Sequence, residues 1–202
     1  MLEIEVKLKV SPEEGKKLSD TKMVKQFAVS SREERLVSRY YDTDGLALMQ
    51  NKYAFRVRET ERGFIQSIKT DGSVNSGLHQ RNEEEWVIES SQPKLDVLPE
   101  ALKKVIQKNG GKVEEVFKTD FIRAIWHLEL KNGTEIELAF DHGHVCAGNL
   151  KKPICEIEME LCEGDKVSLI DAAKSLQREI EATPFDESKA ERGYALLKKS
   201  KR

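Results

Sequence analysis

The chain has 202 residues and a mass of 23.1 kDa, which is enough for one ordinary domain with a substantial core. Its 34 basic and 36 acidic residues nearly balance, and a formal net charge of −2 argues against a nucleic-acid-binding protein. No run approaches the roughly 18 apolar residues that a membrane span needs. We therefore predict a single domain over residues 1–202, with no nucleic-acid or membrane partner and an undetermined oligomeric state.

Two further features of the sequence indicate where the protein resides. The N-terminus does not show the basic stretch followed by an apolar core that is typical of a secretory signal. The three cysteines, Cys146, Cys155 and Cys162, form no CxxC pair and are odd in number, which suits a reducing compartment. We expect a cytoplasmic protein whose cysteines are buried packing residues.

The first predicted element is a strand over residues 1–10. Its even positions are all aliphatic, and its odd positions from Glu3 onward are all charged, as Glu3, Glu5, Lys7 and Lys9. This period of two predicts a strand with one apolar face and one ionic face.

Helices are predicted between the strands. Ser11, Pro12 and Glu14 provide an N-cap, a first-turn proline and a capping-box acid, which predict a helix to about Phe27. Further helices are expected over residues 99–108 and 165–180 and over the C-terminal stretch SKAERGYALLKK.

Seven further segments show the same alternation as the first strand. They are residues 36–42, 53–60, 64–70, 81–90, 119–130, 134–141 and 153–162. Turn signals at 61–63 and 131–134 predict hairpins and a mostly antiparallel sheet. Eight strands are the number at which a small barrel can close.

The ionic faces of these strands are grouped by sign. Basic residues share a face at Arg56 and Arg58, whereas three glutamates share a face at Glu156, Glu158 and Glu160. A solvated outer face is the usual meaning of such alternation. However, glutamates at alternate positions repel one another unless a cation lies among them, so the grouping favours a ligand.

We therefore predict an α+β fold: a closed eight-stranded antiparallel β-barrel, or tunnel, with helices packed on the outside. Its ionic faces would point inward and form one acidic and one basic wall. Mg²⁺ or Mn²⁺ would suit Glu3, Glu5, Glu156 and Glu158, because these cations prefer oxygen ligands. The basic wall, Lys7, Arg56, Arg58 and Lys69, would suit a polyanion. A metal-bridged triphosphate satisfies both walls.

These residues also carry a family resemblance. Glu3-x-Glu5-x-Lys7 resembles the ExExK signature of the CYTH superfamily, also called triphosphate tunnel metalloenzymes. Further matches follow in order along the whole chain: Tyr40-Tyr41-Asp42-Thr43, Arg56-x-Arg58, Lys69, Arg81-x-Glu83-x-Glu85, Arg123, Asp141, Glu156-x-Glu158, Lys189 and Arg192-Gly193-Tyr194.

The resemblance implies an enzyme that acts on a small-molecule triphosphate with Mg²⁺ or Mn²⁺ as cofactor. It implies metal binding by Glu3, Glu5, Asp141, Glu156 and Glu158. It implies substrate binding by Lys7, Arg56, Arg58, Lys69, Arg81, Arg123 and Lys189. Catalytic roles fall to Glu3, Glu5, Lys7 and Glu158, and the proton acceptor is Glu158 or Glu85.

Three stretches, GLHQR, PICEIEMEL and SKAERGY, are similar to the bacterial branch associated with inorganic triphosphate hydrolysis. Members of that branch often carry a further C-terminal helical domain rich in histidine. Because the sequence extends only to Arg202, we expect no contribution from such a domain.

We predict hydrolysis of inorganic triphosphate to pyrophosphate and phosphate. A thiamine triphosphatase and a class IV adenylate cyclase, which makes cyclic AMP from ATP, remain alternatives because they would use the same metal and phosphate residues. A non-catalytic module that binds polyphosphate is a third alternative, but it would not need the acidic wall.

Overall fold

The computed structural model describes residues 2–60 and 63–201, apart from the side chain of residue 71. Its strands are β1 (Leu2–Val10), β2 (Ala28–Asp42), β3 (Ala54–Thr60), β4 (Gly63–Asn75), β5 (Leu78–Ile88), β6 (Glu114–Glu129), β7 (Glu135–Ala147), β8 (Leu150–Glu163) and β9 (Ala182–Pro184). Its helices are α1 (Pro12–Lys16), α2 (Lys22–Phe27), α3 (Ala47–Gln50), α4 (Glu100–Lys108), α5 (Lys166–Leu176) and α6 (Lys189–Ser200), with a 3₁₀ turn at Leu18–Asp20.

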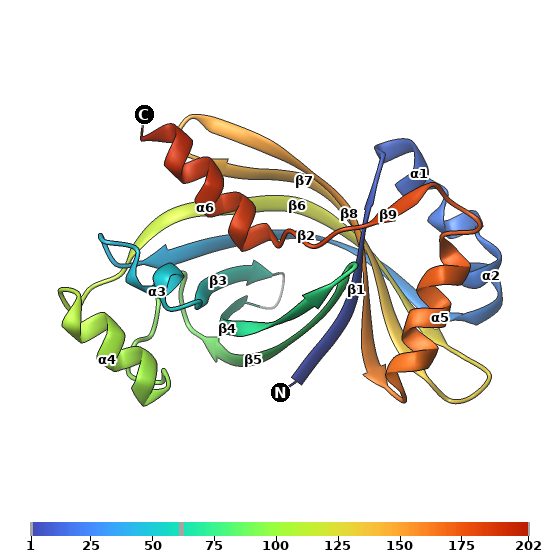
Figure 1. The fold of residues 1–202 in the computed structure, drawn as a ribbon, viewed down its shortest axis with the longest axis horizontal. Coiled ribbons are helices and arrows are strands. Elements are labelled where there is room, and N and C mark those ends of the chain that lie inside the picture. Colours follow the sequence, from blue (N-terminus) through green and yellow to red (C-terminus); the bar gives the residue numbers. More distant parts are fainter. Residues whose placement is uncertain (1, 61–62, 202) are drawn as a thin grey trace.

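The strands form a closed barrel, which is drawn in Figure 1. Within the described residues, the order is β5-β4-β3-β2-β6-β7-β8-β1, and an antiparallel pairing between β1 and β5 closes the ring. The short strand β9 lies outside this ring, and among the described strands it pairs with β1 alone. The predicted closed eight-stranded antiparallel barrel is therefore confirmed.

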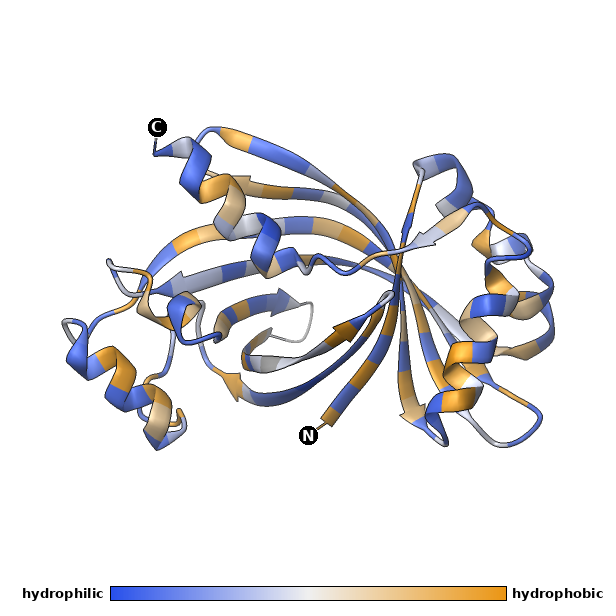
Figure 2. Cartoon of the chain, in the orientation of Figure 1, coloured by the Kyte–Doolittle hydropathy of each residue, from blue (hydrophilic) through white to orange (hydrophobic). Residues whose placement is uncertain are grey.

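The barrel carries much of its apolar core on the outer face. Residues alternate between hydrophilic and hydrophobic along most strands in Figure 2. On β1, Val6, Leu8 and Val10 point outward and pack with residues of α2 and α5. A second outer cluster lies under α4, where Leu102 and Ile106 pack with Phe55 and Val57 of β3. Helices therefore cover the outside, as predicted.

Helix α6 differs because it packs against the inner face of the sheet. Phe121 and Arg123 lie two residues apart on β6 and so share one face of that strand. Phe121 packs with Tyr194 and Leu197 of α6, whereas Arg123 lines the cavity inside the barrel. The N-terminus of α6 thus forms part of the cavity wall, as Ser188 and Lys189 also line it.

Several element boundaries differ from the prediction. The predicted helix that ends near Phe27 is divided into α1, the 3₁₀ turn and α2, because Thr21 caps a new helix after Ser11 has capped the first. Strand β2 begins at Ala28 because residues 28–35 pair with β6, although most of them are exposed and show no clear alternation. The predicted turn at 61–63 falls partly on residues 61–62, which lie outside the described residues.

Two other expectations concern solvent exposure. Cys162 is exposed, so the prediction that all three cysteines are buried packing residues is wrong for this one; Cys146 and Cys155 are partly buried. Among the helices of the described ranges, none combines the length and the apolar character that crossing a membrane requires.

Candidate active site

A cavity of about 260 Å³ lies inside the barrel. Its charged lining consists of eight basic side chains and eight acidic ones. The basic ones are Lys7, Arg32, Arg56, Arg58, Lys69, Arg81, Arg123 and Lys189, and the acidic ones are Glu3, Glu5, Glu34, Glu83, Glu85, Glu137, Glu158 and Glu160. A water molecule takes about 30 Å³ of liquid, so this space can hold a polyanionic ligand rather than only a few waters.

The alternation of β1 explains why charged side chains are buried here. Glu3, Glu5 and Lys7 occupy every second position and are only 8%, 2% and 1% exposed. The next odd residue, Lys9, is exposed. On the ionic face of β1, the first three charged side chains therefore point into the cavity, and the fourth, Lys9, lies outside it.

Three carboxylates form a compact cluster at one side of the cavity. Asp141 on β7 and Glu156 and Glu158 on β8 each place one oxygen within 4.8 Å of the others. The ammonium of Lys189 lies among them, at 2.6 Å from Asp141, 2.5 Å from Glu156 and 2.9 Å from Glu158. Three of the five predicted metal ligands are thus brought together, and a cation already occupies their centre.

Other cations hold the same carboxylates in place. The guanidinium of Arg123 donates two hydrogen bonds of 2.7 Å to Asp141 and also pairs with Glu158. Lys7 lies 3.3 Å from Glu158. Burial alone would raise the pKa of Glu158, but Lys189, Lys7 and Arg123 outweigh it and hold that pKa well below its usual range. Glu158 is therefore ionised at neutral pH.

The other two predicted metal ligands contact Lys69 and Arg81 and share Lys7 with Glu158. Glu3 accepts hydrogen bonds from Lys69 at 2.6 Å and from Arg81 at 2.9 Å. Glu5 accepts one from Arg81 at 2.7 Å and lies 3.6 Å from Lys7. Burial would raise the pKa of Glu3, but Lys69 and Arg81 more than offset it, so that the pKa is lowered.

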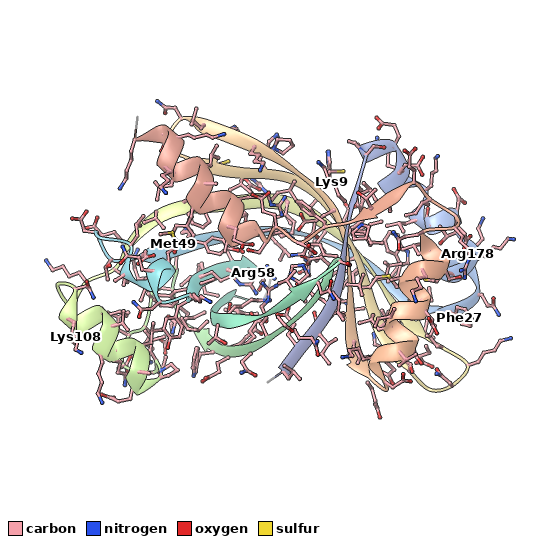
Figure 3. All side chains as sticks on the ribbon, viewed as in Figure 1. Lys9, Phe27, Met49, Arg58, Lys108 and Arg178 are labelled. Carbon is pink, nitrogen blue, oxygen red and sulfur yellow. The ribbon has the colours of Figure 1, made fainter. Side chains whose placement is uncertain are left out.

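Arg58 differs from the other arginines that were predicted to bind substrate. Arg56 pairs with Glu83 at 3.0 Å, whereas Arg58 donates to the hydroxyl of Ser38 and has no carboxylate within salt-bridge distance among the described residues. Figure 3 shows Arg58 in the interior of the barrel. Burial and the neighbouring charges of Arg56 and Arg123 lower the pKa of Arg58 to about 10. Such a cation would be stabilised by an added anion.

All twelve predicted site residues are accounted for in this region. Ten line the cavity directly: Glu3, Glu5, Lys7, Arg56, Arg58, Lys69, Arg81, Arg123, Glu158 and Lys189. The remaining two, Asp141 and Glu156, are fully buried and contact Lys189 behind the lining.

Two residues that hold this arrangement together were named among the family matches but were given no role in the predicted site. Arg192 is 2% exposed and pairs with Glu156, one turn of α6 beyond Lys189. Glu83 pairs with both Arg56 and Lys69. The sequence contained a signal for Arg192, because residues three apart, such as 189 and 192, share a helix face. It also contained a signal for Glu83, because residues 81, 83 and 85 alternate along a strand and so share one face.

Comparison of the sequence with known protein families gives one match. The sequence matches the CYTH domain family over residues 1–194. The chain belongs to the CYTH domain family. The resemblance predicted from the sequence motifs is therefore confirmed, including its extent along nearly the whole chain.

A curated relative is similar to this chain over nearly the whole length of the chain. An inorganic triphosphatase of Haemophilus influenzae is 32% identical to this chain over 195 residues. That alignment covers 96% of this chain and 54% of the relative. The chain therefore spans about half the length of this curated relative.

Solved CYTH-like structures share the fold. One is HpAC1 from Hippeastrum, which is named as an adenylyl cyclase and described by a dominant triphosphatase activity. Its TM-score is 0.63 at 20% sequence identity, and the match covers 98% of this chain and 96% of HpAC1. The Mimivirus capping enzyme triphosphatase has a TM-score of 0.51 at 11% identity and covers 89% of each chain. At these identities the comparison shows the fold.

The CYTH family is metal-dependent, and the carboxylate cluster fits a divalent cation. Asp141, Glu156 and Glu158 offer oxygen ligands, which Mg²⁺ and Mn²⁺ prefer. The Lys189 ammonium, which contacts all three, shows that this position already stabilises positive charge.

Proposed function

We propose that this chain hydrolyses a small-molecule triphosphate, most readily inorganic triphosphate, to pyrophosphate and phosphate. The observation that carries the proposal is the position of Arg58, a partly buried guanidinium with no carboxylate partner among the described residues, in a cavity that borders a carboxylate cluster. An anion would compensate the charge of the first, and the second stabilises positive charge. A metal-bound triphosphate supplies both charges. The 32% identity to an inorganic triphosphatase supports the choice of substrate.

The basic residues would bind and orient the substrate. Arg56, Arg58, Lys69 and Arg81 come from three adjacent strands and face one cavity, so their donors can contact several phosphate oxygens at once. Phosphoryl transfer gains chiefly from such positioning and from neutralisation of charge on the oxygens. Lys7, buried beside Glu5 and Glu158, would add positive charge from the first strand.

The acidic residues would hold the metal and move a proton. We assign Mg²⁺ or Mn²⁺ to Asp141, Glu156 and Glu158, with Glu3 and Glu5 of the adjacent strand β1 as further ligands. When bound, the metal supplies charge neutralisation and lowers the pKa of a coordinated water. Glu158 or Glu85, which both line the cavity, accepts the proton of the attacking water. A cytoplasmic location belongs to the same proposal.

Product identification tests this function. The purified chain is incubated separately with inorganic triphosphate, thiamine triphosphate and ATP, each with Mg²⁺ or Mn²⁺. We expect pyrophosphate and orthophosphate from inorganic triphosphate at the highest rate. Cyclic AMP and pyrophosphate from ATP would identify a cyclase instead, and the absence of product from all three would contradict an enzymatic role.

Arg58→Met tests the basic wall in the same assay. Loss of charge-assisted hydrogen bonds should lower kcat/KM by about 10- to 100-fold. The matched control is Arg35→Met, because Arg35 pairs with Asp120 and its side chain is 69% exposed, away from the cavity lining. Equal activity of Arg58→Met and the control would contradict phosphate binding by Arg58.

A further inference from the structure

Lys189 was predicted to bind substrate, but its ammonium lies at the centre of the carboxylate cluster. Its ammonium contacts one oxygen of each of Asp141, Glu156 and Glu158 at 2.5–2.9 Å. Among the described residues, no other side chain is in salt-bridge contact with all three of these acids. Lys189 therefore occupies the place where a ligand of the whole cluster would lie.

The cluster does not depend on Lys189 alone. Each carboxylate has another cationic partner: Arg123 contacts Asp141 and Glu158, and Arg192 contacts Glu156. If the Lys189 ammonium left, every acid would keep at least one salt bridge, and Glu158 would keep two, to Arg123 and Lys7. The three carboxylates would therefore stay in place and have oxygen lone pairs available to a new cation.

We propose that Lys189 is an internal counter-cation that a divalent metal ion displaces from Asp141, Glu156 and Glu158. This inference rests on the metal site of the proposed function. An ammonium and a divalent cation cannot share one set of oxygens, since like charges a few ångströms apart repel strongly in a buried site. Lys189 lines the cavity, so its displaced ammonium would turn toward the bound triphosphate.

The displacement couples the two ligands of the cavity. Metal binding leaves the charge of Lys189 without its carboxylates, and an anion in the cavity would compensate that charge. Each ligand should therefore increase the affinity of the chain for the other, as thermodynamic linkage requires. In the absence of an anion, Lys189 should weaken metal binding.

Equilibrium binding of Mn²⁺ without phosphate tests the competition. Free Mn²⁺ is measured by EPR during titration of the wild type, Lys189→Met and Arg58→Met. Lys189→Met should bind Mn²⁺ at least about tenfold more tightly than the wild type. Arg58→Met is the matched control, because it removes the same charge from the same cavity without freeing a carboxylate, and its affinity should change by less than about threefold.

An unchanged or lower Mn²⁺ affinity in folded Lys189→Met would overturn the proposal, and so would an equal gain in Arg58→Met. A second measurement uses the wild type, in case Lys189→Met does not fold. An amine-acetylating reagent is applied with and without Mn²⁺, and labelling at Lys189 and at the exposed Lys198, the reference that should not change, is quantified by mass spectrometry. Labelling of Lys189 should rise at least about threefold with bound Mn²⁺, because three carboxylates no longer hold its amine in the charged form.

Neither measurement requires turnover, so the inference and the function can fail separately. If the chain binds Mn²⁺ as predicted but cleaves no triphosphate, the competition stands and the proposed function does not. If triphosphate is cleaved but Mn²⁺ leaves the labelling of Lys189 unchanged, the function stands and the displacement is wrong.

Discussion

Glu3 and Glu5 pair with lysines that also pair with another carboxylate. If either glutamate were neutralised, its lysine would therefore still have one carboxylate partner. Lys69 also pairs with Glu83, and Lys7 also lies beside Glu158. Replacement of either glutamate by glutamine should therefore leave the fold intact while it removes one carboxylate from the cavity. This separates a role in catalysis from a role in stability.

We expect Glu3→Gln and Glu5→Gln to lower the turnover of triphosphate by about 100-fold or more, because both are assigned to the metal and catalytic set. Steady-state kinetics and thermal melting of the purified variants measure the two effects. Glu129→Gln, at an exposed position at the end of β6, is the control and should match the wild type. Wild-type turnover in both test variants would remove these residues from the active site.

At the level of single residues, the sequence predicted ten of the charged side chains that line the cavity but not their pairing. Alternation on β1 was enough to place Glu3, Glu5 and Lys7 on one face. The contact of Glu3 with Arg81 depends on the register of β1 against β5, which joins residues 78 positions apart. The contacts of Lys189 depend on where α6 docks, and no local pattern encodes that position.

Among the elements, α6 was predicted as a helix but not as part of the inner wall. Its docking depends on a glycine: a Cβ atom at Gly193 would lie 2.0 Å from the ring of Phe117. That ring cannot move away freely, because it stacks on Tyr40 at 4.5 Å and meets Tyr194 edge-on at 4.9 Å. The sequence motif Arg192-Gly193-Tyr194 thus has a packing reason that only the tertiary structure reveals.

Gly193→Ala should therefore destabilise the protein, although alanine is the better helix former by about 1 kcal/mol. Overpacking against Phe117 costs about 1–3 kcal/mol, and we expect a net loss of about 1 kcal/mol in the free energy of unfolding. Urea unfolding measures it. Lys198→Ala, at an exposed position of the same helix, should change stability by less than about 0.5 kcal/mol. A stabilised Gly193→Ala variant would show that α6 docks differently.

The shorter elements show another limit of prediction from sequence. Helix α3 has four residues and β9 has three, too few for any periodicity to be read. Both are fixed by contacts made elsewhere: Asp42 accepts hydrogen bonds from the backbone of Leu48 and Met49 in α3, and β9 pairs with β1. Their existence therefore follows from the closed barrel rather than from local sequence.

Over the whole molecule, the barrel places its ionic residues in the centre and its apolar residues largely outside. Fold stability should therefore depend on charge pairing in the cavity as well as on the outer clusters. Glu83 is a suitable probe, because it pairs with Arg56 at 3.0 Å and with Lys69 at 3.0 Å and is not among the proposed metal ligands. Burial would raise its pKa, but Arg56 and Lys69 outweigh this and lower the pKa to about 2.

This lowered pKa predicts how stability changes with pH. Because the ordinary pKa of a glutamate is 4.5, the ionised Glu83 stabilises the folded chain above that pH, and its contribution is lost as the pH falls toward about 2. Glu83→Gln should therefore lower the free energy of unfolding by about 2–3 kcal/mol at pH 7, and by roughly half of that or less at pH 3. Urea titrations of the metal-free protein at both pH values measure this difference. The control is Glu84→Gln, at the neighbouring exposed position, which should change the free energy of unfolding by less than about 0.5 kcal/mol at either pH. If the effect of Glu83→Gln were the same at both pH values, a stabilising ion pair inside the barrel would be contradicted.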